Sequence, residues 1–360
     1  MRNTHTFRLF AAASLAAFMM LPVCAGGKKD TAQKNGAASV PEQQEQTPAL
    51  QEQTAAQPSA ESTDEVRVGI LNGPTSIPVA YMVDAKPVIN GRSVVFDKYA
   101  TPQALLPKML KGEVDIGFMP ANIAAKVYNS AAGALLCAGI SGDGNLYLIT
   151  KDRSIKTLSD LAGKIVSVAG QGATPEYLFR WILAQNKIPV NSQNGVKLDY
   201  SIPTPDIAAE LLSDKIKYAV VPEPFATVAL MKSKDVVRAL DLQYEFGAIE
   251  GKNATYPLTV MVVSRAFAER EPETVRAFIN AFSESLAWTI ANPQKAGVLV
   301  QKYTLGLMAP VVANAVPYSC LVWKSADDSR KEIERLLSIF LQFAPDSVGG
   351  KLPDEGFYFK

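Results

Sequence analysis

The sequence predicts an α/β protein folded into two lobes. From residue 65 onward, short apolar runs alternate with amphipathic helical stretches, which is typical of βαβ units and mainly parallel sheets. Two apolar runs, at 146–150 and 258–263, are the predicted strands on which the chain crosses to a second lobe and returns. These crossings divide the chain into lobe one, 65–147 plus 257–360, and lobe two, 148–256.

The N-terminal segment predicts export. A basic start precedes the apolar run 9–23, which is shorter than the roughly 20 residues of a spanning helix and typical of a signal peptide at 1–23. Cys24 follows in a string that resembles a bacterial lipobox, although Val23 stands where a small residue is usual. The alternatives are lipidation of Cys24, with anchoring to the cell membrane facing the periplasm or exterior, and plain secretion after a site such as Ala25.

Residues 24–64 have the composition of a disordered linker. They are rich in Gln, Ala, Thr, Glu and Pro and contain no aromatic residue, so they cannot bury enough apolar surface to offset the entropy of ordering. A tether between an anchored cysteine and a folded protein fits this composition.

Charge and histidine content exclude several classes of function. The 36 Lys and Arg residues nearly balance the 35 Asp and Glu residues, which gives no electrostatic footprint for nucleic acid. The one histidine, His5, lies in the signal segment, so catalysis through Ser-His-Asp or Cys-His pairs and ordinary His-containing zinc sites are excluded. Cys137 and Cys320 could pair, or remain two buried free thiols. We expect no metal and no cofactor.

Lobe one is predicted to begin with alternating strands and helices. Thr101-Pro102 opens one helix, since Thr is a good N-cap and Pro at the first helical position loses no needed donor, and Gly112 ends it. The predicted strands are 66–71, 93–99, 114–119 and 134–140, and the helices start at 77, 102 and 122.

Lobe two repeats this pattern, and the C-terminal part is predicted to be helical. Thr174-Pro175 and Thr204-Pro205 open helices in the same way. The predicted strands are 164–169, 196–202, 218–221 and 236–240, with a further helix at 225–231 and a loop at 243–254. After Ser264 the predicted helices are 265–292, 294–303, 309–316 and 327–343. The last has one apolar face, which we expect to pack on lobe one.

Ligands of open α/β sheets bind at the carboxyl ends of the strands, so the loops there supply the candidate ligand-binding residues. In lobe one each loop has a structural alternative: a plain turn for the first, and a helix cap for Asn122. The candidates in this lobe are Asn72, Gly73, Thr75, Pro120, Asn122, Ser141 and Gly142.

In lobe two, the loop 170–175 begins like a dinucleotide-binding motif but has Pro175 where the third glycine belongs, so we reject that interpretation. A glycine-rich turn before a helix remains a good cradle for polar groups. Glu223 is either a helix cap or an orienting contact to a ligand N–H, and Phe225 offers a ring face. The candidates in this lobe are Gln171, Gly172, Thr174, Glu223, Phe225 and Tyr256.

Several of these strings together carry a resemblance that covers about 66–358. They are Gly73-Pro74-Thr75, Lys111-Gly112-Glu113-Val114-Asp115-Ile116, Pro120-Ala121-Asn122, Gly172-Ala173-Thr174-Pro175-Glu176-Tyr177, Pro222-Glu223-Pro224-Phe225 and Val348-Gly349-Gly350-Lys351-Leu352-Pro353. In order and spacing the chain resembles substrate-binding proteins of ABC transporters of the NMT1/THI5-like, SsuA-like family. The resemblance implies a type II periplasmic-binding-protein fold, with the C-terminal helices as an extension on lobe one, and an ABC permease with its ATPase as partners. The histidine and the cysteine-rich motif used by the pyrimidine-synthesising enzymes of this family are absent, so that activity is not implied.

The sequence therefore predicts a monomeric solute-binding protein of an ABC importer that captures a small molecule by hinge closure. The predicted loops hold no Arg or Lys, which favours a neutral or weakly basic heterocycle, such as a thiamine pyrimidine precursor or a flavin. The alternatives are a small anion (sulfonate, nitrate or aromatic acid), a ligand-sensing lipoprotein without transport, and an enzyme built on the same fold.

Overall fold

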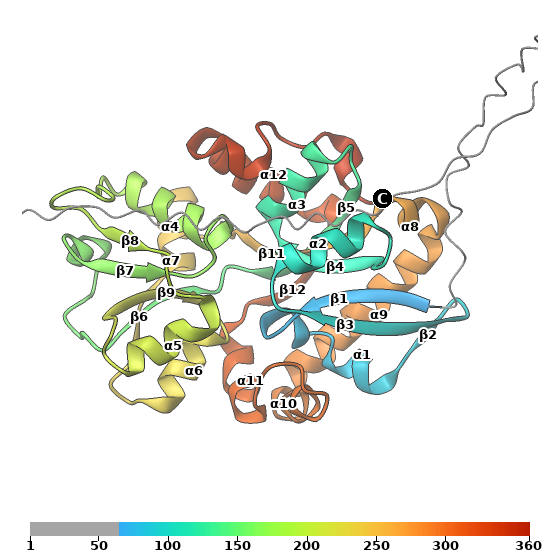
Figure 1. The fold of residues 1–360 in the computed structure, drawn as a ribbon, viewed down its shortest axis with the longest axis horizontal. Coiled ribbons are helices and arrows are strands. Elements are labelled where there is room, and N and C mark those ends of the chain that lie inside the picture. The colour runs from blue at the N-terminus through green and yellow to red at the C-terminus, as the bar shows by residue number, and fades with distance from the viewer. Residues whose placement is uncertain (1–64) are drawn as a thin grey trace, which may run out of the picture. The chain divides into compact units, whose positions relative to one another are not determined.

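The computed structural model describes residues 65–360. The predicted signal peptide, the linker 24–64 and the lipidation site Cys24 lie outside the described residues. Within 65–360, no helix is both long enough and apolar enough to cross a lipid bilayer. Figure 1 shows the described chain, coloured from blue to red along its length.

A seven-stranded sheet contains the beginning and the end of the described chain. Its β1 pairs in parallel with β3 and β4, whereas β11 and β12 run antiparallel to their neighbours. The strand β5 is buried along its whole length, because β11 and β12 flank it. In spatial order the strands are β12 (Leu321–Ser325), β5 (Leu135–Asp143), β11 (Pro257–Ser264), β4 (Ile116–Pro120), β1 (Glu65–Leu71), β3 (Arg92–Tyr99) and β2 (Val88–Ile89).

A five-stranded sheet is built from the middle of the chain. Its strands β7, β8 and β9 are parallel, and β6 and β10 add antiparallel pairings. In spatial order they are β10 (Val237–Asp241), β6 (Leu146–Thr150), β9 (Tyr218–Pro222), β7 (Ile165–Val168) and β8 (Lys197–Asp199).

The helices connect these strands, and α2 starts with the predicted cap. Thr101 Oγ1 accepts the N–H of Ala104 at 3.3 Å, and Pro102 occupies the first helical position, as predicted. In α4 and α5 the predicted caps Thr174 and Thr204 are instead the first helical residues, and no side chain caps either start. The helices are α1 (Ala80–Ala85), α2 (Pro102–Leu110), α3 (Ala121–Ser130), α4 (Thr174–Gln185), α5 (Thr204–Leu212), α6 (Phe225–Lys232), α7 (Leu242–Glu250), α8 (Arg265–Arg270), α9 (Pro272–Ala291), α10 (Pro293–Lys302), α11 (Ala309–Ala315) and α12 (Ala326–Phe343), with short 3-10 turns at Pro74–Ser76, Leu158–Leu161, Val316–Tyr318, Pro345–Val348 and Glu355–Phe357.

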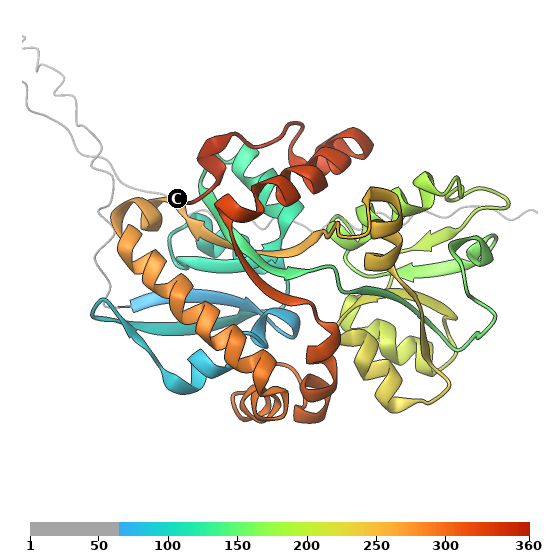
Figure 2. The same cartoon turned by 180° about the vertical axis from the view of Figure 1, so that it is seen from behind.

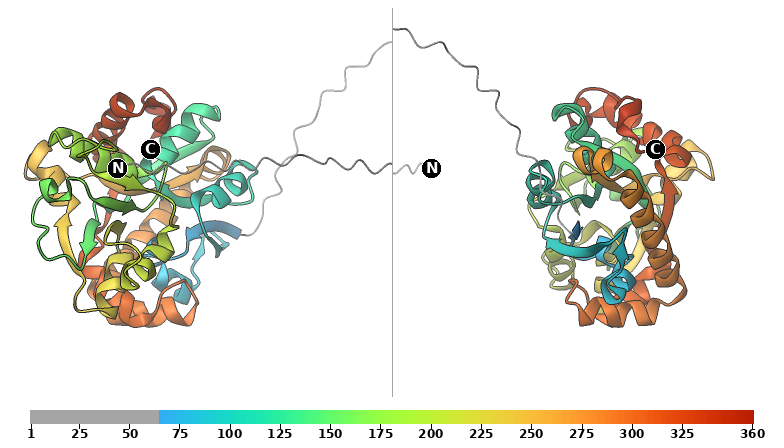
Figure 3. Two further views of the ribbon diagram at one scale, coloured as in Figure 1. Left: turned by 60° about the vertical axis from the view of Figure 1, so that its left-hand side comes forward. Right: turned by 90° about the vertical axis from the view of Figure 1, so that its right-hand side faces the viewer.

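Neighbouring residues of β4 show how helices cover both faces of the larger sheet. Phe118 packs against Phe282 of α9, with ring centroids 5.2 Å apart. The preceding residue, Gly117, lies close to α2: a Cβ atom added to Gly117 would be 2.8 Å from Met109 Sδ. Successive strand residues point to opposite faces, so α9 and α2 lie on opposite sides of the sheet. Figure 2 shows α9 crossing one face, and Figure 3 shows the sheet between the two layers.

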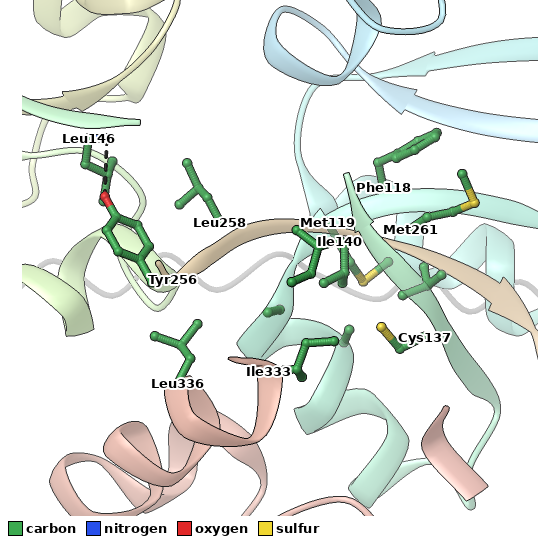
Figure 4. Packing of buried hydrophobic residues seen from close by; sticks show 14 of the residues in the cluster. Phe118, Met119, Cys137, Ile140, Leu146, Tyr256, Leu258, Met261, Ile333 and Leu336 are labelled. Atoms are coloured by element: carbon green, nitrogen blue, oxygen red, sulfur yellow. Dashed lines mark hydrogen bonds between the residues drawn. The ribbon is translucent and has the colours of Figure 1, made fainter. Parts of the chain in front are cut away.

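Two connections carry the chain between the sheets. The first passes from β5 to β6 through Gly144, and the second from α7 to β11 through Tyr256. Tyr256 is fully buried, and its hydroxyl accepts the Leu146 N–H at 3.4 Å (Figure 4). A Cβ on Gly144 would lie 2.5 Å from the Tyr256 ring, so the two connections pack directly against each other.

The structure corrects four expectations. Residues 321–325 form β12, so the chain after Ser264 is not entirely helical. The predicted loop 243–254 contains α7, because Asp241 caps it and Phe246 anchors it against Trp181. The helix predicted at 265–292 is interrupted at Glu271-Pro272, since a proline inside a helix removes a hydrogen bond. Cys137 and Cys320 are free, but only Cys137 is buried; Cys320 is exposed.

Candidate ligand-binding site

A cavity of about 510 Å³ lies where strands of both sheets end. Leu71 and Pro120 are the last residues of β1 and β4 in the larger sheet. In the smaller sheet, Ala169 directly follows β7, and Pro222 is the last residue of β9. All four positions are at the carboxyl ends of parallel strands, where α/β sheets bind ligands. The cavity therefore joins the equivalent ends of the two sheets.

The wall between these strand ends is made largely of helix starts. Residues in the first turn of α2, α4, α5 and α6 line the cavity together with the 3-10 turn Pro74–Ser76. First-turn N–H groups have no partner within their own helix, so those that the protein leaves unbonded can meet polar groups of a ligand. Ala104 and Thr227 already donate to Thr101 and Glu223, and Pro102, Pro175 and Pro205 have no N–H. The polar and aromatic lining side chains are Asn72, Thr75, Thr101, Gln103, Asn145, Gln171, Thr204, Glu223, Phe225 and Thr259.

Of the described residues that line this cavity, Glu223 is the one with an ionisable side chain. Its carboxylate is paired: Oε1 accepts Arg238 Nε at 3.0 Å and also Arg238 Nη2, and Oε2 accepts the Thr227 N–H at 3.2 Å. The Arg238 guanidinium in turn lies 4.1 Å from the ring centroid of Tyr318. Glu223 therefore bonds to the start of α6 and joins a buried ion pair, and it is also one of the residues that line the cavity.

A second, much smaller chamber of about 20 Å³ adjoins the cavity, since the two share Pro74, Thr75, Asn145, Glu223 and Thr259. Its remaining wall includes Ser141 and Gly142. These two residues belong to β5 rather than to the loop predicted after it, because Gly142 is paired with Thr259 on one side and Leu321 on the other. The chamber has room for about one water-sized group.

Asn122 and Thr174 lie off the cavity wall and contact each other. Asn122 is 1% exposed; its Nδ2 donates to the carbonyls of Gly172 (3.1 Å) and Ser347 (3.3 Å), and its Oδ1 accepts the Thr174 hydroxyl at 3.3 Å. Asn122 is on α3 and Thr174 on α4, so these bonds connect elements associated with different sheets.

Three further candidates also have structural positions. Gly73 has a φ of 102°, and its N–H donates to the Leu305 carbonyl at 3.4 Å. The Gly172 N–H donates to Glu176 Oε2 at 2.8 Å. Tyr256 is enclosed between the chain connections, as described above. None of the three is part of the cavity wall.

Six predicted residues share that wall: Asn72, Thr75, Pro120, Gln171, Glu223 and Phe225. Sequence reasoning missed Thr101, Gln103, Thr204 and Asn145. A signal for three of them was present, since Thr101-Pro102 and Thr204-Pro205 open helices in the same way as Thr174-Pro175. For Asn145, which lies between two strands, the sequence gives no such signal.

This arrangement can enclose and orient a small molecule. Prolines and the side chains of Leu71, Met119, Ile123 and Leu258 give the cavity apolar surfaces, and hydroxyl and amide side chains surround them. Such a combination is typical of small-molecule sites. Within 65–360, no group of three or more His, Cys, Asp or Glu side chains is placed to hold a metal ion.

Several solved structures share this fold. An ABC transporter from Parabacteroides distasonis is 24% identical, with a TM-score of 0.69, over 82% of this chain and 99% of that one. The periplasmic aliphatic sulphonate binding protein SsuA from Escherichia coli is 18% identical, with a TM-score of 0.64, over 83% and 93% of the two chains. The desulfurization enzyme DSZB is 15% identical, with a TM-score of 0.54, over 82% and 97%.

These likenesses confirm the predicted two-lobed α/β fold. No curated protein matches the sequence. The model of the NMT1-like family, however, matches residues 20–301, which is most of the sequence. The family prediction is thus confirmed: this chain belongs to the NMT1-like family.

Proposed function

We propose that this protein is the solute-binding component of an ABC importer, exported and facing the periplasm or cell exterior. It captures a small molecule in the 510 Å³ cavity and delivers it to a permease with its ATPase. Lobe one comprises 65–147 and 257–360, lobe two comprises 148–256, and the connections through Gly144 and Tyr256 act as the hinge. The joining of both sets of strand ends in one cavity supports this proposal most directly.

The lining favours a neutral or weakly basic heterocycle as the ligand, such as a pyrimidine precursor or a flavin. The described residues of the cavity wall include no Arg, Lys or His, whereas proteins that hold sulfonate or carboxylate groups commonly use a bidentate arginine. Prolines and Phe225 supply flat apolar surfaces on which a ring can lie.

A small anion is the second candidate, because several helix starts meet at the cavity. Their N–H groups and dipoles favour negative charge even without a cationic side chain. The SsuA protein of Escherichia coli, which shares the fold, is a sulphonate binder by name.

Binding without chemical change separates this proposal from an enzyme of the same fold. A fold alone does not decide function, and DSZB is an enzyme. Glu223 is the one ionisable side chain among the described lining residues, and its carboxylate is bonded to Arg238. The described part of the cavity wall therefore offers no free carboxylate, imidazole or amine for acid-base catalysis.

Native mass spectrometry of protein purified without denaturation is the direct test. We expect one small molecule per chain, released on unfolding and recovered unchanged after rebinding. A heterocycle supports the first candidate, and a sulfonate, nitrate or carboxylate supports the second. Conversion of the recovered molecule during incubation would contradict the binding role.

A further inference from the structure

The small chamber contains a buried hydrogen-bond acceptor without a partner in the protein. Asn145 is 7% exposed and lines both the chamber and the larger cavity. Its Nδ2 donates to the Ser319 carbonyl at 2.9 Å, while its Oδ1 is buried and accepts no hydrogen bond. A buried polar atom left unpaired costs free energy, so an unpartnered oxygen at a cavity wall points to a ligand contact.

The orientation of this amide follows from its neighbours. A carbonyl oxygen can only accept, so the atom facing Ser319 must be the Asn145 nitrogen and the other must be the oxygen. The backbone fixes the residue as well, because the Asn145 carbonyl accepts the Glu223 N–H at 3.1 Å. Rotation of the amide would break the bond to Ser319, so the unpaired atom of this side chain remains the oxygen, an acceptor.

The neighbouring side chains add acceptors rather than donors. Thr75 Oγ1 already donates to the Leu71 carbonyl at 3.1 Å, and Ser141 Oγ donates to the Thr259 carbonyl at 3.3 Å. The Glu223 carboxylate, 1% exposed as a residue, can only accept. Among these side chains a group entering the chamber finds acceptors, so a donor on the ligand is the partner that satisfies Asn145 Oδ1.

We propose that Asn145 determines the specificity of the cavity by accepting a hydrogen bond from a ligand N–H or O–H group placed in the chamber. The ligand end that enters is an uncharged or cationic donor, such as an amino, amide or hydroxyl group. A sulfonate, nitrate or carboxylate end is disfavoured there, because it brings no donor for Asn145 Oδ1. This inference rests on the proposed binding function and names the ligand chemistry of the same site.

Three probes of nearly the same shape test it in the wild-type protein. Benzamide carries an N–H donor, acetophenone replaces the amide NH₂ with a methyl group, and benzoate carries a negative charge. We expect benzamide to bind about tenfold more tightly than either of the others in ligand-observed NMR titrations, since leaving one buried acceptor unpaired costs that much. This comparison needs no variant to fold.

A pair of matched variants isolates the residue. Asn145→Leu removes the acceptor, and we expect it to abolish the preference for benzamide over acetophenone. Asn129→Leu is the control: its Nδ2 also donates to carbonyls, of Val348 and Lys351, its Oδ1 is also buried and unpartnered, and it lies outside the cavity lining. Asn129→Leu should keep the wild-type preference even if both variants lose stability.

The outcomes separate this inference from the function on which it rests. Equal or tighter binding of benzoate or acetophenone by the wild type overturns the role of Asn145 and leaves small-molecule binding intact. Retention of the preference in a folded Asn145→Leu variant does the same. A wild-type protein that carries no small molecule and binds none of the probes overturns the binding function itself.

Discussion

The side chain of Asn122 donates a hydrogen bond of 3.1 Å to the carbonyl of Gly172, which connects a helix beside the larger sheet to a loop of the smaller sheet. The Thr174 hydroxyl, beside Gly172, returns a bond to the same amide at 3.3 Å. Asn122 therefore has its hydrogen-bonding groups occupied by protein in this arrangement. A residue predicted to cap a helix or to touch the ligand connects α3 to the loop before α4 in this structure.

This connection leads to a prediction about binding. Asn122→Ala removes the bonds between α3 and the loop before α4, so the lobes should separate more readily. We expect the dissociation constant of the co-purified ligand to rise about five- to twentyfold, corresponding to about 1–2 kcal/mol. Calorimetric titration measures this, and small-angle X-ray scattering of the ligand-free protein should report a larger radius of gyration.

The control for that variant is Asn314→Ala, because the Asn314 amide bonds within its own helix, to the Pro310 carbonyl at 2.7 Å. Its binding should match the wild type. Unchanged affinity in the Asn122 variant would show that these bonds do not hold the lobes together.

A second prediction concerns the buried ion pair. Arg238→Leu leaves the Glu223 carboxylate, whose side chain is fully buried, without its cationic partner. Breaking a buried pair by removing one member typically costs about 3–5 kcal/mol, and we expect a loss of unfolding free energy in this range in chemical denaturation.

Arg276→Leu provides the contrast, since Arg276 pairs with Glu273 on the surface with side chains 47% and 79% exposed. That change should cost less than about 1 kcal/mol. Similar losses in the two variants would contradict a structural role for the Glu223–Arg238 pair.

A third prediction concerns pH. The pKa of Asp152 falls from 3.8 to about 2, because the Ser154 hydroxyl, the Tyr218 hydroxyl and the Ser154 N–H donate to its carboxylate. Since the folded-state pKa is depressed, the stabilisation is present above about pH 4 and is lost as the pH falls toward 2. Asp152→Asn should therefore lack this part of the acid dependence of the melting temperature.

Tyr218→Phe tests the cause directly. It removes a donor whose oxygen lies 2.7 Å from Asp152 Oδ2, so the Asp152 pKa should move back toward its ordinary value in an NMR titration of the carboxyl group. A pKa that stays near 2 would assign the shift to Ser154 alone.

A fourth prediction concerns the thiols. Burial raises the pKa of Cys137 to about 12 and partial burial raises that of Cys320 to about 11, but a reagent can reach only the exposed Cys320. In the folded protein a maleimide should label Cys320 first and leave Cys137 unmodified until denaturant is added, as peptide mass mapping can show. Equal labelling rates in the absence of denaturant would contradict the buried position of Cys137.

Much of the fold was predictable because its local signals agree. Thr-Pro pairs mark the starts of three helices, and continuous apolar runs mark the buried strands. The strand β12 escaped prediction because its apolar run, Leu321-Val322-Trp323, is only three residues long, and all five residues of the strand are only partly buried at a sheet edge. Helix α7 was predicted as a loop because the segment contains two glycines. Gly247 is buried inside the helix, and Gly251 ends it.

The site was predictable in its loops but not in its pairings. Glu223 was recognised because it follows a strand and precedes a helix, but its partner Arg238 lies on β10, two strands away in the sheet order. The order of strands in the sheet is set by the fold, so no spacing in the sequence predicts the Glu223–Arg238 pair. Asn145 escaped for a similar reason, because its importance comes from an oxygen left unpaired by its neighbours.

The order of the strands also bears on how the chain acquires its structure. All five strands of the smaller sheet come from the continuous stretch 146–241. In contrast, β5 pairs with β11 and β12, which are more than a hundred residues further along the chain. Contacts between distant parts of a chain form slowly. The smaller sheet can therefore assemble while the larger sheet is still incomplete, and β5 stays uncovered on one side until the C-terminal segment that contains β12 has been made. A chain truncated before Leu321 should thus be prone to aggregate through the unpaired edge of β5.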